Sequence, residues 1–97
     1  MIIKWNKTAV KQLIEAIEFI EEHEFYSYAI ELERRILSRV HSLPNNYKIY
    51  PLDKYKKKND GSYRAFETDS YRVSYRVHNN EIKILRVRHT SRRPRKY

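Results

Sequence analysis

A strict two-residue alternation between residues 71 and 77 constrains the fold of this chain more than any other feature. Apolar or aromatic side chains occupy the odd positions and polar ones the even positions: Tyr71, Val73, Tyr75 and Val77 against Arg72, Ser74 and Arg76. A period of two is typical of a β-strand with one buried and one solvated face. Asn79-Asn80 follows, and because asparagine tolerates a positive φ angle, this pair predicts a tight hairpin turn.

Two neighbouring segments extend this strand into a predicted antiparallel meander. One runs over residues 63–68, and the other over 82–87 after the Asn-Asn turn. In the last strand we expect Leu85 and Val87 to face the core. The predicted outer face then carries a row of arginines, with Arg64 of the first strand expected to join those of the other two: Arg64, Arg72, Arg76, Arg86 and Arg88.

Two segments with helical periodicity precede the meander. Asn6 is a candidate N-cap for a first helix reaching about Glu22. A second helix is expected to end before Pro44. Their apolar residues recur at spacings of three and four: Val10, Leu13, Ile14, Ile17 and Ile20 in the first, Ala29, Leu32, Ile36, Val40 and Leu43 in the second. Core packing explains these stripes, and an interaction helix is the alternative.

A short strand is also predicted at residues 2–5, and residues 47–51 are a candidate for a further one. The first strand, the two helices and the meander give the element order β-α-α-β-β-β, an α+β fold with a two-helix hairpin on one face of an antiparallel sheet. With 97 residues and no linker, we expect one domain over residues 1–97.

Composition excludes several classes of chemistry. The chain has no cysteine and one glycine, which excludes thiolate catalysis, Cys-ligated zinc and a glycine-rich phosphate loop. The four histidines lack metal-ligand spacing, so we expect no metal site and no cofactor. No apolar run reaches the roughly 20 residues of a membrane span, and no signal peptide is evident. We expect a cytoplasmic protein without membrane contact.

The formal charge of +9 is concentrated in the second half. Residues 1–46 hold six Lys and Arg against seven Glu, a net of −1, whereas residues 47–97 hold fifteen against five acids, a net of +10. Such asymmetry indicates a polyanionic partner, either nucleic acid or an acidic protein; a merely solvated surface is the alternative.

Guanidinium groups on a bare sheet face suit phosphate, because the Arg fork matches its oxygens. Arginine can also stabilise the phosphorane of RNA cleavage without a metal, with a Lys, His or Tyr moving the protons. His89 and Tyr97 are candidates, although a packed strand-end residue and a frayed C-terminal aromatic, respectively, are the simpler interpretations. A lysine run is either a solvated loop or a phosphate-contacting one: Lys54, Lys56, Lys57 and Lys58.

The whole chain resembles the RelE/ParE superfamily, toxins of bacterial type II toxin–antitoxin modules that are often described as plasmid stabilisation proteins. The resemblance is carried by the element order, the opening Ile-x-Trp, the strand Tyr71-Arg72-Val-x-Tyr75-x-Val77, and Ile84-Leu85-Arg86-Val87-x-His89 with its basic tail.

A RelE-like assignment implies a ribosome-dependent endoribonuclease that cuts mRNA. By that resemblance Arg64 contacts phosphate or assists proton transfer, Arg72 and Arg92 stabilise the phosphorane, and Tyr97 stacks on a base or assists transfer. His89 completes the candidate catalytic set. The remaining basic residues are predicted to bind nucleic acid: Lys54, Lys56, Lys57, Lys58, Arg76, Arg86, Arg88, Arg93 and Arg95. The implied partners are a cognate antitoxin, the ribosome and mRNA.

A ParE-like assignment implies a different target, DNA gyrase, which is inhibited by binding and without catalysis. His89-x-x-Arg92-Arg93 resembles the end of that group's last strand. Phe66 replaces a second lysine of the RelE-like pattern, and Arg64 is a poor general base because its guanidinium stays protonated. A plain RNA-binding domain is the third reading; it would need exposed aromatics on the sheet, and only Phe66 is well placed.

Overall fold

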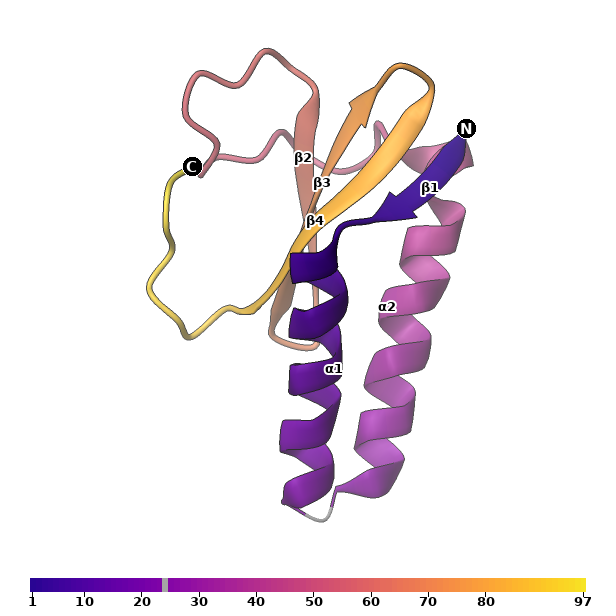
Figure 1. The fold of residues 1–97 in the computed structure, drawn as a ribbon, viewed down its shortest axis with the longest axis vertical. Coiled ribbons are helices and arrows are strands. Elements are labelled where there is room, and N and C mark those ends of the chain that lie inside the picture. Colours follow the sequence, from indigo (N-terminus) through magenta and orange to yellow (C-terminus); the bar gives the residue numbers. More distant parts are fainter. Residues whose placement is uncertain (24) are drawn as a thin grey trace.

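The computed structural model describes residues 1–23 and 25–97, which form two helices and four strands. The predicted order is confirmed, with these bounds: β1 (Ile2–Trp5), α1 (Lys7–Glu22), α2 (Tyr26–Asn46), β2 (Tyr63–Thr68), β3 (Tyr71–His78) and β4 (Glu81–His89). The predicted α+β class is confirmed as well. Both helices lie on one side of the sheet, and the loop before β2 and the segment after β4 lie on the other (Figure 1).

The four strands are arranged in the order β1-β4-β3-β2. The meander β2-β3-β4 is antiparallel, as predicted. β1, however, pairs in parallel with β4, from Ile2 opposite Glu81 to Trp5 opposite Ile84, so the sheet is mixed. Four residues carry too little pattern to fix a pairing direction. The direction follows instead from the path of the chain, because β1 must lead into α1.

The core lies between the sheet and the helices. All five apolar positions predicted for α2 are buried. In α1 the buried residues are Ala9, Leu13, Ala16 and Ile20, whereas Val10 and Ile14 are 41% and 50% exposed, contrary to prediction. The apolar stripe of α1 is wider than its contact with the sheet, so periodicity alone did not locate the buried edge.

The segment after α2 differs from the prediction in two respects. The helix continues through Pro44 to Asn46, because a proline in the last turn removes only one backbone hydrogen bond. Residues 47–51 form no strand, and only Leu52 makes an isolated bridge, to Arg64. Tyr47 is instead fixed by Tyr75, whose buried hydroxyl donates a hydrogen bond of 2.7 Å to the Tyr47 carbonyl oxygen.

A β-bulge in β4 changes the face to which its residues point. The register shifts opposite Ser74 and Tyr75, which pair with Arg86 and Ile84, so Leu85 is the extra residue. Ile84 and Val87 both reach the core, and the prediction that Leu85 faces it is wrong. The Asn79-Asn80 turn is confirmed, with φ angles of 51° and 59°.

The helix N-cap offers a first test of these contacts. Asn6 accepts a hydrogen bond of 2.7 Å from the Ala9 backbone N–H. Asn6→Ala should therefore lower the free energy of unfolding by about 1 kcal/mol, measured by urea denaturation. Asn45→Ala, an exposed change near the end of α2, is the matched control and should stay within about 0.5 kcal/mol of wild type. Equal losses in both variants would contradict the cap.

Candidate functional site

The sheet face turned away from the helices is strongly basic. Three even-numbered β3 residues lie on it, flanked by their register partners on β4 and β2: Arg72 between Arg88 and Glu67, Ser74 between Arg86 and Ala65, and Arg76 between Lys83 and Tyr63. Arginines of β3 and β4 therefore gather on one face, as the alternation predicted.

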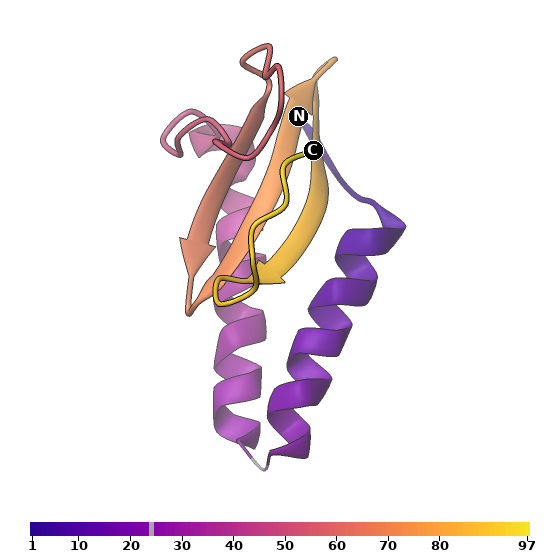
Figure 2. The same cartoon turned by 90° about the vertical axis from the view of Figure 1, so that its left-hand side faces the viewer.

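Residues Ser91–Tyr97, here called the strap, cross this face (Figure 2). At its start, the Arg92 N–H donates to the His89 carbonyl oxygen, closing a turn. At its end, the Tyr97 N–H donates to the Tyr55 carbonyl oxygen at 2.9 Å, and the Lys57 N–H donates to the Tyr97 carbonyl oxygen at 2.7 Å. Side chains 91–96 are exposed between these two anchors. The strap is thus fixed at both ends.

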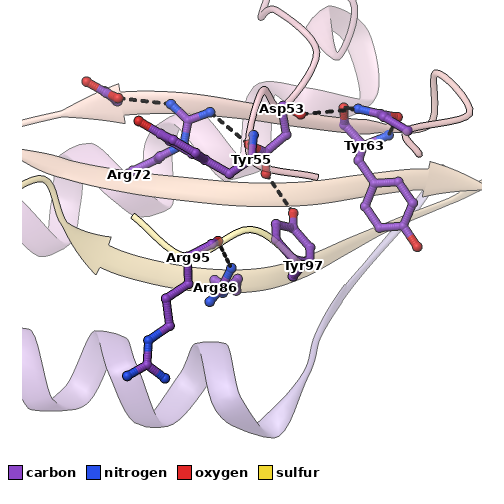
Figure 3. A network of polar contacts seen from close by, with 9 residues as sticks. Asp53, Tyr55, Tyr63, Arg72, Arg86, Arg95 and Tyr97 are labelled. Atoms are coloured by element: carbon purple, nitrogen blue, oxygen red, sulfur yellow. Dashed lines mark hydrogen bonds and ion pairs between the residues drawn. The ribbon is translucent and has the colours of Figure 1, made fainter. Parts of the chain in front are cut away.

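Asp53 is the hub of the site (Figure 3). Its side chain is fully buried, and it accepts three hydrogen bonds: from Arg72 Nη2 at 2.9 Å, from the Tyr97 hydroxyl at 2.6 Å and from the Tyr55 N–H at 3.0 Å. The last bond is local and the other two are long-range. One carboxylate therefore joins the loop before β2, strand β3 and the strap.

The ionisation of this hub follows from its contacts. Burial by itself would raise the pKa of Asp53, but the hydrogen bonds from Tyr97, Arg72 and the Tyr55 N–H outweigh it and lower that pKa below its ordinary value. Burial, followed by the hydrogen bond to Asp53 and then by the Asp53 charge, raises the pKa of Tyr97. At neutral pH Asp53 is an anion, and the Tyr97 hydroxyl is a protonated donor.

Arg72 is neutralised by its own chain. Besides Asp53 it contacts Glu67, whose Oε2 lies 2.9 Å from Nη1, and its guanidinium lies 4.9 Å from the centre of the Tyr55 ring. Burial would lower the pKa of Arg72, but the hydrogen bonds that it donates to both carboxylates raise that pKa overall. Among the described residues, its Nε is the one buried side-chain polar atom without a hydrogen-bond partner.

Four of the five predicted catalytic residues line one pocket of about 60 Å³ between strap and sheet: Arg72, His89, Arg92 and Tyr97. Arg64 does not. It pairs with Tyr75 on the helix side of the sheet and donates a 2.6 Å hydrogen bond to the Tyr50 carbonyl oxygen. The prediction that Arg64 joins the outer arginines is wrong, because it shares a face with Phe66, which is buried in the core.

His89 shapes the turn into the strap. Its Nδ1 accepts a hydrogen bond from the Ser91 N–H at 3.1 Å and lies 2.7 Å from Ser91 Oγ. Its ring meets Tyr71 edge-on, with 5.0 Å between ring centres. These contacts favour the interpretation of His89 as a packed residue at the end of β4.

The residues predicted to bind nucleic acid divide into two groups. Arg86, Arg88 and Arg95 line the same pocket as Arg92, and Arg93 is exposed on the strap. The others surround the loop before β2. Arg76 donates a hydrogen bond to Ser62 and lies 3.6 Å from Asp60. Two of the predicted lysines, Lys54 and Lys56, lie over aromatic rings. The other two lysines of this loop are Lys57 and Lys58.

The arginines of the pocket rim and strap carry positive charge that the chain does not neutralise. Five make no ion pair with a carboxylate in the described part of the chain: Arg86, Arg88, Arg92, Arg93 and Arg95. Burial, and then the charges of Arg86, Arg95 and Arg92, lower the pKa of Arg88. Guanidiniums held this close repel one another, and an incoming anion would relieve the repulsion.

Sequence reasoning missed Asp53 and Glu67, which decide the state of Arg72. A signal was present, since Asp53 is the one acid between residues 47 and 59. No group of three His, Asp or Glu side chains in residues 1–23 and 25–97 is placed to hold a metal. None of the described helices is long and apolar enough to cross a membrane.

Fold and site together define a toxin of the RelE/ParE superfamily, with a helical hairpin behind the sheet and an arginine-rich face in front. The family described as "ParE toxin of type II toxin-antitoxin system, parDE" matches residues 3–94, and the chain belongs to this family. A solved structure titled "Chromosomal ParDE TA system from P. aeruginosa" is similar, with a TM-score of 0.73 and 18% identity over 94% of this chain and 97% of that one. No curated protein sequence matches the chain.

The hub should make folding stability depend on pH. Because the pKa of Asp53 is lower in the folded state, its stabilising contribution is present above the unfolded value of about 3.9 and is lost as pH falls through the folded value. Asp53→Asn should cost about 2 kcal/mol at pH 7 and lose less stability on acidification than wild type. Chemical denaturation at pH 7 and pH 3 measures both effects.

Asp60→Asn is the control for that experiment. Asp60 is also an aspartate facing an arginine, but it is exposed. Its loss should cost much less than the loss of Asp53. A pH profile of Asp53→Asn that parallels wild type at every pH would contradict the assignment of Asp53 as the hub.

Proposed function

We propose that this ParE-family toxin inhibits DNA gyrase by binding it, without catalysis, and is neutralised by a cognate antitoxin. The observation that carries the proposal is the state of Arg72 and Tyr97. Of the four groups that the RelE-like resemblance assigns to RNA chemistry, these two already bind Asp53. What the face offers to a partner is a set of exposed arginines rather than an assembled catalytic centre.

Most of the candidates for the proton transfers of RNA cleavage are already engaged or remain protonated in this arrangement. Arg72 and Arg92 remain protonated and cannot act as bases. The raised pKa of Tyr97 keeps its hydroxyl protonated, and that proton is donated to Asp53. His89 uses Nδ1 within its own turn. Arg64, the remaining candidate, faces the helices.

Binding a partner does not require these residues to transfer protons, as RNA cleavage would. Arginine is favoured at interfaces, where its planar fork pairs with carboxylate or phosphate. The five arginines without carboxylate partners surround the strap and pocket, and the strap side chains are open to solvent. Such a surface suits an acidic region of gyrase, and it equally suits an acidic antitoxin segment that covers it. The similar structure is titled as a ParDE toxin–antitoxin system, which supports an antitoxin partner.

A ribosome-dependent mRNA endoribonuclease is the second candidate. It is favoured by the convergence of Arg72, His89, Arg92 and Tyr97 on one pocket. For this activity the ribosome and mRNA would have to displace Asp53 from Arg72 and Tyr97. That step would leave a buried carboxylate without its partners, at a cost of roughly 3–5 kcal/mol.

A gyrase supercoiling assay tests the main proposal. Wild type should inhibit supercoiling, and the double variant Arg88→Gln/Arg92→Gln should need at least tenfold more protein for half inhibition, because it removes charge from the centre of the face. Lys7→Gln/Lys11→Gln removes the same charge from exposed positions on α1 and should behave as wild type. If both double variants inhibit gyrase equally weakly, the inhibition depends on the net charge of the protein and not on the arginine face.

A ribosome-programmed cleavage assay tests the second candidate. The wild-type chain should leave mRNA intact. If wild type cleaves mRNA in the ribosomal A site and Arg92→Gln abolishes that cleavage, the inhibitor proposal is wrong and the protein is a nuclease. Arg72→Ala is unsuitable for this comparison, because it leaves the buried Asp53 unpaired and would destabilise the fold.

A further inference from the structure

The Tyr97 anchor concentrates most of the contacts that fix the strap. The hydroxyl reaches Asp53, and both backbone groups of Tyr97 pair with the loop segment 55–57. The Tyr97 ring lies beneath the Arg86 guanidinium, 4.6 Å from the ring centre, and near the Lys56 ammonium at 5.3 Å. Between this anchor and the turn at His89, the only hydrogen bond between sheet and strap in the described residues is weak: Arg86 Nη1 donates to the Arg95 carbonyl oxygen at 3.4 Å.

The fixed strap brings like charges together. It places Arg92 and Arg95 at a pocket that already holds Arg86 and Arg88 of β4. The pocket lining holds five guanidiniums against the two carboxylates of Asp53 and Glu67, a formal charge of +3. Repulsion opposes this arrangement, so a specific contact is needed to maintain it. The hydrogen bond between Tyr97 and the buried, ionised Asp53 is such a contact.

The hub can release the strap without collapsing. If the Tyr97 hydroxyl leaves, Asp53 keeps Arg72 and the Tyr55 N–H as partners. The sheet and its Arg72 ion pair therefore do not depend on the strap. The strap, in turn, receives from Asp53 the side-chain hydrogen bond at its end.

We propose that Asp53 is a positioning residue that latches the strap over the sheet through the Tyr97 hydroxyl, and that the latched strap is the form that engages an anionic partner. This inference deepens the proposed function and rests on it for the identity of the partner. Preordering the arginines lowers the entropy lost on association, which is the physical advantage of the latch.

Tyr97→Phe tests the latch because it removes one hydroxyl and no charge. The strap offers trypsin cleavage sites after Arg92, Arg95 and Lys96, while Pro94 protects Arg93. Trypsin should cleave the strap at least tenfold faster in the variant than in wild type, as measured by mass spectrometry. The thermal unfolding of the rest of the domain should be nearly unchanged. Tyr63→Phe is the control, since the Tyr63 hydroxyl has no hydrogen-bond partner in the described residues and its ring meets Tyr97 edge-on.

Two binding readouts connect the latch to partner engagement. Tyr97→Phe should elute from immobilised heparin, a sulfated polyanion, at lower salt than wild type despite its unchanged charge. It should also need at least fivefold more protein to inhibit gyrase. Tyr63→Phe should match wild type in both measurements.

A disulfide provides a rescue. Lys56 is the direct backbone neighbour of Tyr97, because the hydrogen bonds from Tyr97 N–H to Tyr55 and from Lys57 N–H to Tyr97 flank it. Neighbouring strands lie within disulfide reach, and the chain has no other cysteine. Lys56→Cys/Tyr97→Cys should therefore retain the strap when oxidised and release it when reduced, so that heparin affinity and gyrase inhibition rise on oxidation.

The outcomes separate the two levels of the proposal. Wild-type trypsin resistance in Tyr97→Phe would overturn the latch. A released strap with unchanged heparin elution and unchanged gyrase inhibition would overturn the positioning role. If wild type fails to inhibit gyrase while Tyr97→Phe loses heparin affinity and oxidation restores it in the cysteine pair, the target is wrong and the latch stands.

Discussion

A buried carboxylate in the most basic part of the chain is the constraint on which the functional face depends. Asp53 has no exposed side-chain surface, so it must find hydrogen-bond donors within the protein. It takes one from its own turn, one from β3 and one from the strap. Backbone hydrogen bonds also join the loop to the strap and to β2, and Asp53 adds the side-chain link that ties both to β3. The anion thus provides both the charge that holds Arg72 and the acceptor that holds Tyr97.

This pairing changes the meaning of the sequence resemblance. A motif transfers residue types, and Arg72 and Tyr97 do occupy positions that resemble those of RelE-like nucleases. It does not transfer the partners of those residues. An arginine between two carboxylates has its charge-assisted bonds already made, and a phosphate must compete with them. In this structure both side chains are bound to Asp53 and so help to hold the face together.

The sequence predicted what depends on local periodicity and missed what depends on distant partners. The alternation in β3 and the spacing in α2 located buried faces correctly, since each pattern extends over many residues. The parallel pairing of β1, the bulge at Leu85 and the position of Arg64 each depend on a neighbour remote in the chain. Asp53 was missed for the same reason. Its importance comes from residues 19 and 44 positions away, which no local pattern connects.

The arginines without carboxylate partners repel one another, and the latch is the contact that opposes this repulsion. A face of like charges stores repulsion, which the fold tolerates because the strap is fixed by a bond to a group of opposite sign. An acidic partner would relieve that repulsion. Because the strap is already ordered, association would not have to offset the entropy lost in ordering it, and the partner would bind more tightly. An antitoxin and a target that both present anions to this face would compete directly. Under the proposed function, neutralisation of the toxin would then require only that the antitoxin cover the arginines, with no rearrangement of the sheet beneath them.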